Sequence, residues 1–107
     1  MNTEAHPGEV WLVDFGFAAK ERPVVVLSVP KPTDARALAV VAPLTSQLRG
    51  LRGAVDIGKP RWLPKPSAVN VQGLASIDHH ALKKKLGRLP QVQFDAVKAA
   101  TRDLLAL

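Results

Sequence analysis

The sequence predicts an α+β protein that is mainly β: a small, strongly bent β-barrel with a short helix and a C-terminal helix. Three observations favour this class. Short apolar runs rich in β-branched residues follow one another along most of the chain. Seven glycines and nine prolines separate many of these runs. Apolar residues spaced by three and four, as in an amphipathic helix, occur clearly in the last segment. We find no internal repeat and expect one domain over residues 1–107.

The first half of the chain contains three expected strands. Residues 8–15 alternate with apolar side chains on both faces, which predicts an interior strand. Residues 23–29 are a β-branched run whose leading proline suits only the start of a strand. Residues 37–44 form the third strand, and the polar triplet Thr45-Ser46-Gln47 follows it. Residues 30–34 form the turn or loop between the second and third strands.

The second half is expected to hold shorter elements. Residues 49–66 are mostly loop with a short strand at 54–57, and residues 67–74 form the next strand. Asp78 is placed to cap a short helical turn over residues 79–82, and residues 85–89 form the last strand.

The C-terminal segment predicts an amphipathic helix. Pro90 suits its first turn. One face carries apolar residues at helical spacing: Phe94, Val97, Ala100 or Thr101, Leu104 and Leu107.

Composition narrows the class of protein further. Fifteen Lys and Arg against nine Asp and Glu give a net charge of 15 − 9 = +6, with a pI near 10.2. This charge favours a polyanionic partner; the alternative is a basic protein that binds no particular ligand. The absence of cysteine excludes disulfides, thiolate chemistry and Cys-based zinc sites, and it fits a reducing cytoplasm. No apolar stretch approaches the length of a membrane span, and the N-terminus lacks the pattern of a signal peptide. We expect a soluble, unprocessed, cytoplasmic protein.

The basic residues are clustered. The segment 49–65 holds five basic residues and one acid, together with Trp62. Two interpretations stay open: a loop that holds a nucleic-acid backbone while Trp62 stacks on a base, or a solvated loop with Trp62 packed against the barrel. The run Lys83-Lys84-Lys85 is interpreted as a solvated face.

The ends of two expected strands carry the candidate chemistry. If residues 23–29 and 37–44 pair antiparallel, Arg22 and Thr45 lie at the same edge of the sheet. A guanidinium beside a hydroxyl in a basic chain indicates a phosphate site. The alternative for Arg22 alone is a charge in water at the end of a strand.

Other chemistries find no support in the sequence. His79 and His80 are adjacent, so they rarely point the same way, and neither cysteine nor a Glu-rich cluster completes a metal site; we interpret them as solvated. We find no defensible Ser-His-Asp order, no Gly-rich phosphate loop and no matched pair of carboxylates. We therefore expect no metal and no cofactor.

An ordered set of segments resembles a known family. The residues that carry the resemblance are Gly8 to Phe15, Arg22 to Ser28, Val41 to Gln47, Ser76 to Asp78, Leu82 and Leu86 to Leu89. In this order they are similar to the MazF/PemK family of toxin endoribonucleases. The resemblance runs from Gly8 to the terminal helix.

The resemblance implies a fold and an activity. It implies an SH3-like barrel with a C-terminal helix, a homodimer, and metal-independent cleavage of single-stranded RNA that leaves 2′,3′-cyclic phosphate and 5′-hydroxyl ends. Arg22 and Thr45 would occupy the catalytic positions. The implied partner is an antitoxin whose acidic tail blocks the RNA groove of the toxin.

Seven further residues around this pair are expected to bind the substrate. They are Lys20, Glu21, Ser46, Gln47, Arg49, Arg52 and Arg61. Glu21 has three open interpretations: it orients the guanidinium, it acts as a base, or strand alternation aims it away. Compared with the family's usual pattern, the loop between Asp14 and Arg22 is short, which predicts looser gating of the RNA groove.

Two other functions are alternatives to a ribonuclease. A CcdB-like gyrase poison uses the same barrel and dimer but acts through an aromatic C-terminal end, whereas this chain finishes with Leu104-Leu105-Ala106-Leu107. The other alternative is a non-catalytic RNA-binding barrel.

Overall fold

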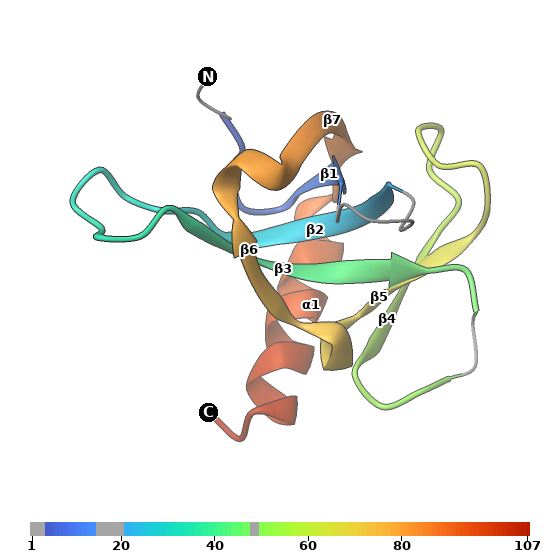
Figure 1. The fold of residues 1–107 in the computed structure, drawn as a ribbon. Helices are drawn as coiled ribbons and strands as arrows, with labels where there is room; N and C mark the ends of the chain where they lie inside the picture. Colours follow the sequence, from blue (N-terminus) through green and yellow to red (C-terminus); the bar gives the residue numbers. More distant parts are fainter. Residues whose placement is uncertain (1–3, 15–20, 48–49) are drawn as a thin grey trace.

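A bent antiparallel sheet with one helix beside it forms the protein (Figure 1). The computed structural model describes residues 4–14, 21–47 and 50–107. Its strands are β1 (Glu9–Val13), β2 (Arg22–Ser28), β3 (Leu38–Thr45), β4 (Ala54–Gly58), β5 (Ser67–Asn70), β6 (Ala75–Asp78) and β7 (Leu82–Arg88). The helices are the 3₁₀ turns η1 (Val71–Gly73) and η2 (His79–Ala81) and the α-helix α1 (Gln91–Leu104).

Strand β1 is interior, as its two apolar faces predict. It pairs antiparallel with β2 on one side and with β7 on the other. Val10 and Val13 are fully buried, in two separate clusters of the core. The predicted placement of this strand is confirmed.

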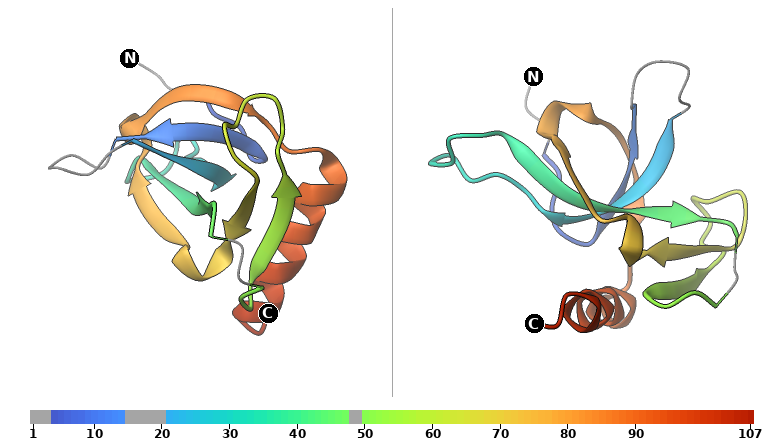
Figure 2. Two further views of the ribbon diagram at one scale, coloured as in Figure 1. Left: turned by 90° about the vertical axis from the view of Figure 1, so that its right-hand side faces the viewer. Right: turned by 60° about the horizontal axis from the view of Figure 1, so that its bottom comes forward.

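Strands β2 and β3 pair antiparallel, which is the condition on which the expected meeting of Arg22 and Thr45 depends. Val24 lies opposite Pro43, Val25 opposite Ala42, and Val26 opposite Val41. Val24, Val25 and Val26 are fully buried, because β2 lies between β1 and β3. The connection between β2 and β3 extends away from the sheet (Figures 1 and 2).

Residues 67–74 do not form one continuous strand, contrary to expectation. Strand β5 ends at Asn70, whose side chain accepts a hydrogen bond from the backbone N–H of Gln72 and starts the turn η1. A β-carbon on Gly73 would lie 2.7 Å from Cγ of Pro43, so only glycine fits there without a shift. The chain then continues as β6, a strand that the sequence analysis missed.

The split in this segment bends the sheet. Strand β5 pairs with the end of β3, at Leu44 and Thr45, whereas β6 pairs with its beginning, from Leu38 to Val41. The strand order is β4-β5-β3-β2-β1-β7, with β6 paired to β3. Among the described strands no pairing joins β4 to β7. The sheet is therefore open in its strand pairing, and the predicted SH3-like β-barrel is not confirmed.

Helix α1 begins after Pro90, as predicted, and lies beside β4 (Figure 2). Phe94 and Val97 are buried in the core that the sheet shares with the helix. Leu107 was expected on this apolar face, but it lies beyond the end of the helix and its exposed fraction is 82%. The short turn η2 is capped by Asp78, which accepts a hydrogen bond from the backbone N–H of His80 at 2.8 Å.

The last strand is longer than predicted. It runs over Leu82–Arg88 and pairs with β1 through two register shifts. Leu82 is buried, so pairing with β1 extends the strand into a lysine run that has little strand propensity of its own. None of the helices described is long and apolar enough to cross a membrane.

Candidate functional site

The register of β2 and β3 brings Arg22 and Thr45 together. Val24 pairs with Pro43 and Val25 with Ala42, and the pairing of the two strands ends at Val24 and Pro43. Arg22 and Thr45 each lie two residues beyond this last pair, at the same end of the two strands. The sequence prediction that these two side chains share one edge of the sheet is supported by this register.

A cleft of about 600 Å³ opens at this edge. Its lining residues are Glu21, Arg22, Pro23, Leu44, Thr45, Ser46, Gln47, Leu63, Pro64, Lys65 and Ser67. Five of the predicted site residues are among them: Glu21, Arg22, Thr45, Ser46 and Gln47. The cleft thus collects an arginine, a lysine and several hydroxyl and amide groups, which together suit an anionic, hydrogen-bonding ligand.

The hydroxyl of Thr45 is held in place by the chain that follows it. The backbone N–H of Gln47 donates a hydrogen bond to Thr45 Oγ1 at 3.1 Å. A hydroxyl that accepts one bond still has its own hydrogen to donate. Thr45 is half-buried at the end of β3, so this hydrogen is available to a ligand in the cleft.

Arg22 and Glu21 are both exposed at the start of β2. The guanidinium presents five N–H donors in a planar fork and stays protonated in proteins. In this position it can bind two oxygens of one phosphate group. Glu21 lines the same cleft, so it remains within the candidate site.

Lys65 is a cleft residue that the sequence analysis did not identify as a binding residue. It belongs to the loop before β5, and its carbonyl oxygen accepts a hydrogen bond from the Ser67 hydroxyl at 3.1 Å. The feature of the sequence that could have identified Lys65 is the basic segment 49–65, in which it is the last residue. Its place in the cleft depends on the pairing of β5 with β3, which the sequence did not predict.

The other predicted binding residues do not all gather here. Arg52 and Arg61 are exposed and do not line the cleft. The carbonyl oxygen of Arg52 instead accepts a hydrogen bond from the Gln72 side chain. Lys20 and Arg49 lie outside the described residues, as does most of the short loop between Asp14 and Arg22.

Trp62 packs against the sheet. Its indole ring lies directly over Gly87 of β7, where a β-carbon would overlap the ring atoms. Trp62 is half-buried and contacts the core that includes Leu89 and Phe94. Of the two interpretations, the structure supports packing, and base stacking on Trp62 is not supported.

The two adjacent histidines do not share one environment. Their ring centroids are 6.0 Å apart and their planes are tilted by 44°. His80 is exposed, with Nδ1 3.7 Å from Oδ1 of Asp78. His79 is half-buried and its Nε2 is buried, so the prediction that both histidines are solvated is wrong for His79. Within the described ranges, no three His, Asp or Glu side chains are grouped closely enough to hold a metal ion.

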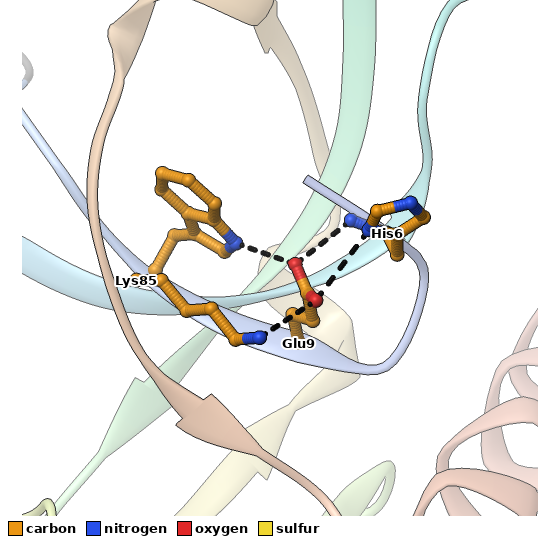
Figure 3. A network of polar contacts seen from close by, with 4 residues as sticks. His6, Glu9 and Lys85 are labelled. Atoms are coloured by element: carbon orange, nitrogen blue, oxygen red, sulfur yellow. Dashed lines mark hydrogen bonds and ion pairs between the residues drawn. The ribbon is translucent and has the colours of Figure 1, made fainter. Parts of the chain in front are cut away.

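A buried carboxylate ties the N-terminal segment to β7 (Figure 3). Glu9 is 5% exposed; its Oε1 accepts hydrogen bonds from the backbone N–H of His6 at 2.9 Å and from the Trp11 indole at 3.0 Å. Lys85 Nζ lies 3.0 Å from Oε2, so this lysine belongs to an ion pair rather than to a purely solvated face. Burial raises the pKa of the Glu9 carboxyl, but the contacts with Trp11, His6 and Lys85 outweigh it and lower that pKa from 4.5 to about 2.

The fold and the cleft define a small, mainly antiparallel β protein whose candidate site combines an arginine with a hydroxyl. Residues 6–105 match the family described as PemK-like, MazF-like toxins of type II toxin–antitoxin systems. The chain belongs to this family.

Individual relatives agree with this assignment. The chain is 35% identical over 96 residues to the probable endoribonuclease MazF5 of Mycobacterium tuberculosis, a match that covers 87% of this chain and 85% of that protein. The solved structure of the Mycobacterium tuberculosis toxin MazF-mt6 has a TM-score of 0.78 at 25% identity, covering 92% of this chain and 97% of the other. A MazE–MazF structure from Deinococcus radiodurans shares the fold, with a TM-score of 0.78 at 22% identity and 96% of both chains covered.

Proposed function

We propose that this toxin-family protein is an endoribonuclease that cleaves single-stranded RNA in the cleft between β2, β3 and the loop before β5. The observation that carries the proposal is that Arg22 and Thr45, from the ends of two paired strands, both line that cleft. Its relative MazF5 is named a probable endoribonuclease, which supports the same activity. Residues 1–107 act as one domain in this proposal.

The reaction uses a nucleophile that RNA itself carries. The 2′-oxygen attacks the adjacent phosphorus and loses its proton, while the bond from phosphorus to the 5′-oxygen breaks and that oxygen gains a proton. The products are a 2′,3′-cyclic phosphate and a 5′-hydroxyl. Negative charge builds on the phosphoryl oxygens in the transition state, and groups fixed in advance around those oxygens lower the barrier.

Arg22 and Thr45 supply that stabilisation. The Arg22 guanidinium neutralises the phosphoryl oxygens, and the Thr45 hydroxyl donates a hydrogen bond to one of them. Because arginine stays protonated in proteins, its role is electrostatic rather than proton transfer. Glu21 lines the cleft and is the candidate to orient the guanidinium or to accept the 2′-proton. No metal or cofactor has a step to perform in this scheme.

The remaining cleft residues bind the RNA strand. Lys65 provides a second positive charge, and Ser46 and Gln47 present hydrogen-bonding groups for phosphate or base edges. Lys20, Arg49, Arg52 and Arg61 are proposed to add to the positive charge that attracts the polyanion.

The same cleft is proposed to receive the antitoxin. A structure of a mycobacterial endoribonuclease with its cognate antitoxin shares the fold of this chain. An acidic tail that folds onto a chain of net charge +6 would cover Arg22 and Lys65 and exclude RNA. We further propose that the protein is a homodimer and acts in the cytoplasm. In this proposal the bent sheet of each subunit is an open form of the SH3-like barrel.

The other two functions have weaker support. The match to the PemK/MazF family and to the probable endoribonuclease MazF5 favours a ribonuclease over the gyrase poison. A non-catalytic RNA-binding protein would show salt-sensitive binding without turnover.

The proposed activity is tested by incubating the purified protein with a long single-stranded RNA in excess EDTA and mapping the new 5′ ends. Discrete cuts with 5′-hydroxyl ends support a metal-independent endoribonuclease. Binding without cuts would identify the non-catalytic alternative.

A further inference from the structure

A second cavity, of about 160 Å³, lies beside the cleft. It is lined by Thr45, Gln47, Gly50, Leu51, Ala54, Asp56, Ala68 and Asn70. Thr45 and Gln47 line both spaces. A ligand whose phosphate lies at Thr45 therefore has this cavity next to it.

Three strands build the cavity floor. Thr45 of β3 lies opposite Ala68 of β5, and Ala68 in turn lies opposite Asp56 of β4. The three residues stand side by side across the sheet, so Asp56 is two strand spacings, about 10 Å, from Thr45. On β4 and β5, Val55, Ile57 and Val69 point the other way, into the core. The alternation of each strand thus separates a core face from a cavity face.

The size and walls of the cavity suit one aromatic ring. Ala54, Ala68 and Leu51 give it apolar walls, and the two alanines keep it open. A cavity of roughly 150 Å³ lined by apolar side chains is large enough to bind benzene. The present cavity is comparable, which favours the single ring of a pyrimidine over the two fused rings of a purine.

Two polar side chains face this space with complementary functions. Oδ1 of Asp56 accepts the backbone N–H of Gly58 at 2.9 Å, which leaves Oδ2 as an acceptor for a ligand. Oδ1 of Asn70 accepts a hydrogen bond from the backbone N–H of Gln72 at 3.2 Å. The NH₂ group of Asn70 is then the part of this side chain that can donate to a ligand. The cavity therefore offers one acceptor and one donor.

We propose that this cavity is a cytosine subsite that holds the base of the nucleotide next to the cleaved phosphate. Cytosine carries an amino donor beside a ring-nitrogen acceptor, and a carboxylate is a known type of acceptor for that amino group. Uracil presents a carbonyl oxygen and an N–H at the same positions, so its oxygen would face the Asp56 carboxylate. The subsite rests on the proposed ribonuclease function and gives that site a sequence preference.

The first test measures binding without cleavage. Fluorescently labelled hexamers of cytidine and of uridine, with every 2′-hydroxyl replaced by fluorine, cannot react but keep their bases. Fluorescence anisotropy with the full-length protein should show roughly tenfold tighter binding of the cytidine hexamer, in keeping with one good polar pair. Equal binding of the two hexamers would overturn the subsite.

The second test changes Asp56. Asp56→Asn keeps an oxygen to accept from Gly58 but turns the acceptor aimed at the ligand into an NH₂ donor, so the preference for cytidine should be lost or reversed. Asp34→Asn is the matched control, since Asp34 also accepts a backbone N–H, from Lys31 at 2.8 Å, but lies in the loop between β2 and β3. A cytidine preference that survives in Asp56→Asn would overturn the assignment of Asp56.

Mapping the cleavage sites distinguishes a failure of the proposed cytosine subsite from a failure of the proposed ribonuclease activity. If the protein cuts RNA, a cytosine should flank the cut sites of the wild type, and this enrichment should be absent for Asp56→Asn. Cuts flanked equally by cytosine and uracil would overturn the subsite while the ribonuclease stands. A protein that cuts no RNA but prefers the cytidine hexamer would overturn the proposed activity and support the cavity as a cytosine-binding site.

Discussion

The side-chain oxygen of Thr45 accepts the backbone N–H of Gln47 at 3.1 Å, and this bond fixes the hydroxyl at the edge of the cleft. The hydroxyl hydrogen can then be donated to a ligand, and the second lone pair of the oxygen can still accept. The strand end and the turn after it therefore orient the donor before any RNA binds, which is the condition for strong transition-state stabilisation.

Replacing Thr45 tests the hydroxyl itself. Thr45→Val keeps the shape but removes the donor, and we expect cleavage to fall by roughly 10² to 10³, as for the loss of one oxyanion donor. Thr45→Ser restores the hydroxyl and should keep most of the rate. Single-turnover cleavage of one RNA by the three proteins measures this, and full activity in Thr45→Val would limit Thr45 to packing.

Lys65 should contribute charge rather than catalysis. In Lys65→Ala, RNA affinity should fall and the slope of log K against log salt should become shallower by about 1, because one phosphate contact is lost. Lys31→Ala, which removes an exposed lysine from the loop between β2 and β3, serves as the control. A salt slope that is unchanged in Lys65→Ala would contradict the placement of RNA in this cleft.

Gly87 should be needed for the packing of Trp62. A β-carbon at Gly87 meets the indole ring, so Gly87→Ala should lower the free energy of unfolding by about 1–3 kcal/mol. In a Trp62→Ala background the same substitution should cost much less, because the ring is absent. Urea denaturation of the two single variants and the double variant measures this coupling, and additive costs would mean that the two residues do not interact.

Glu9 should make stability depend on acid pH. Its folded-state pKa is about 2, below the usual 4.5, so its contribution is fully present above about pH 4.5 and is lost as the pH falls through 2. This difference between the usual and the folded-state pKa corresponds to about 3 kcal/mol of folding free energy. Glu9→Gln should therefore be destabilised at pH 7 by an amount of this order, and the gap to the wild type should close in acid.

The control for this measurement is Glu4→Gln, which changes an exposed carboxyl in the same segment. Denaturant unfolding between pH 2 and pH 7 should show a pH-dependent gap for Glu9→Gln alone. A constant gap would indicate that Glu9 acts through shape rather than charge.

Local patterns were sufficient to predict strands β2 and β3 and the polar residues at their ends. The β-branched run after Pro23 and the polar triplet after Leu44 define where each strand begins and ends, but the antiparallel pairing of the two strands was a condition that only the structure established. Helix α1 could also be predicted from the sequence, because Phe94 and Val97 are apolar residues at helical spacing, and both are buried in the structure.

Contacts between distant segments could not be predicted in the same way. The break between β5 and β6 depends on the Asn70 side chain and on the close approach of Gly73 to Pro43, which are 30 residues apart in sequence (73 − 43 = 30). The places of Lys65 and Asp56 follow from the pairing of β5 with β3 and β4, so neither was recognisable as a neighbour of Thr45. The open sheet also follows from these pairings.

The central claim is that Arg22 stabilises the charge on the cleaved phosphate, and one comparison tests it most directly. Single-turnover cleavage of a single-stranded RNA in EDTA is measured for the wild type, Arg22→Ala, Arg22→Lys and the control Arg36→Ala, whose arginine lies in the exposed loop between β2 and β3. We expect Arg36→Ala to match the wild type. Arg22→Ala should lose roughly 10² to 10³ in rate, and Arg22→Lys should not restore it, because a point charge cannot replace the planar fork. Wild-type cleavage by Arg22→Ala, with the same 5′-hydroxyl ends, would contradict the account.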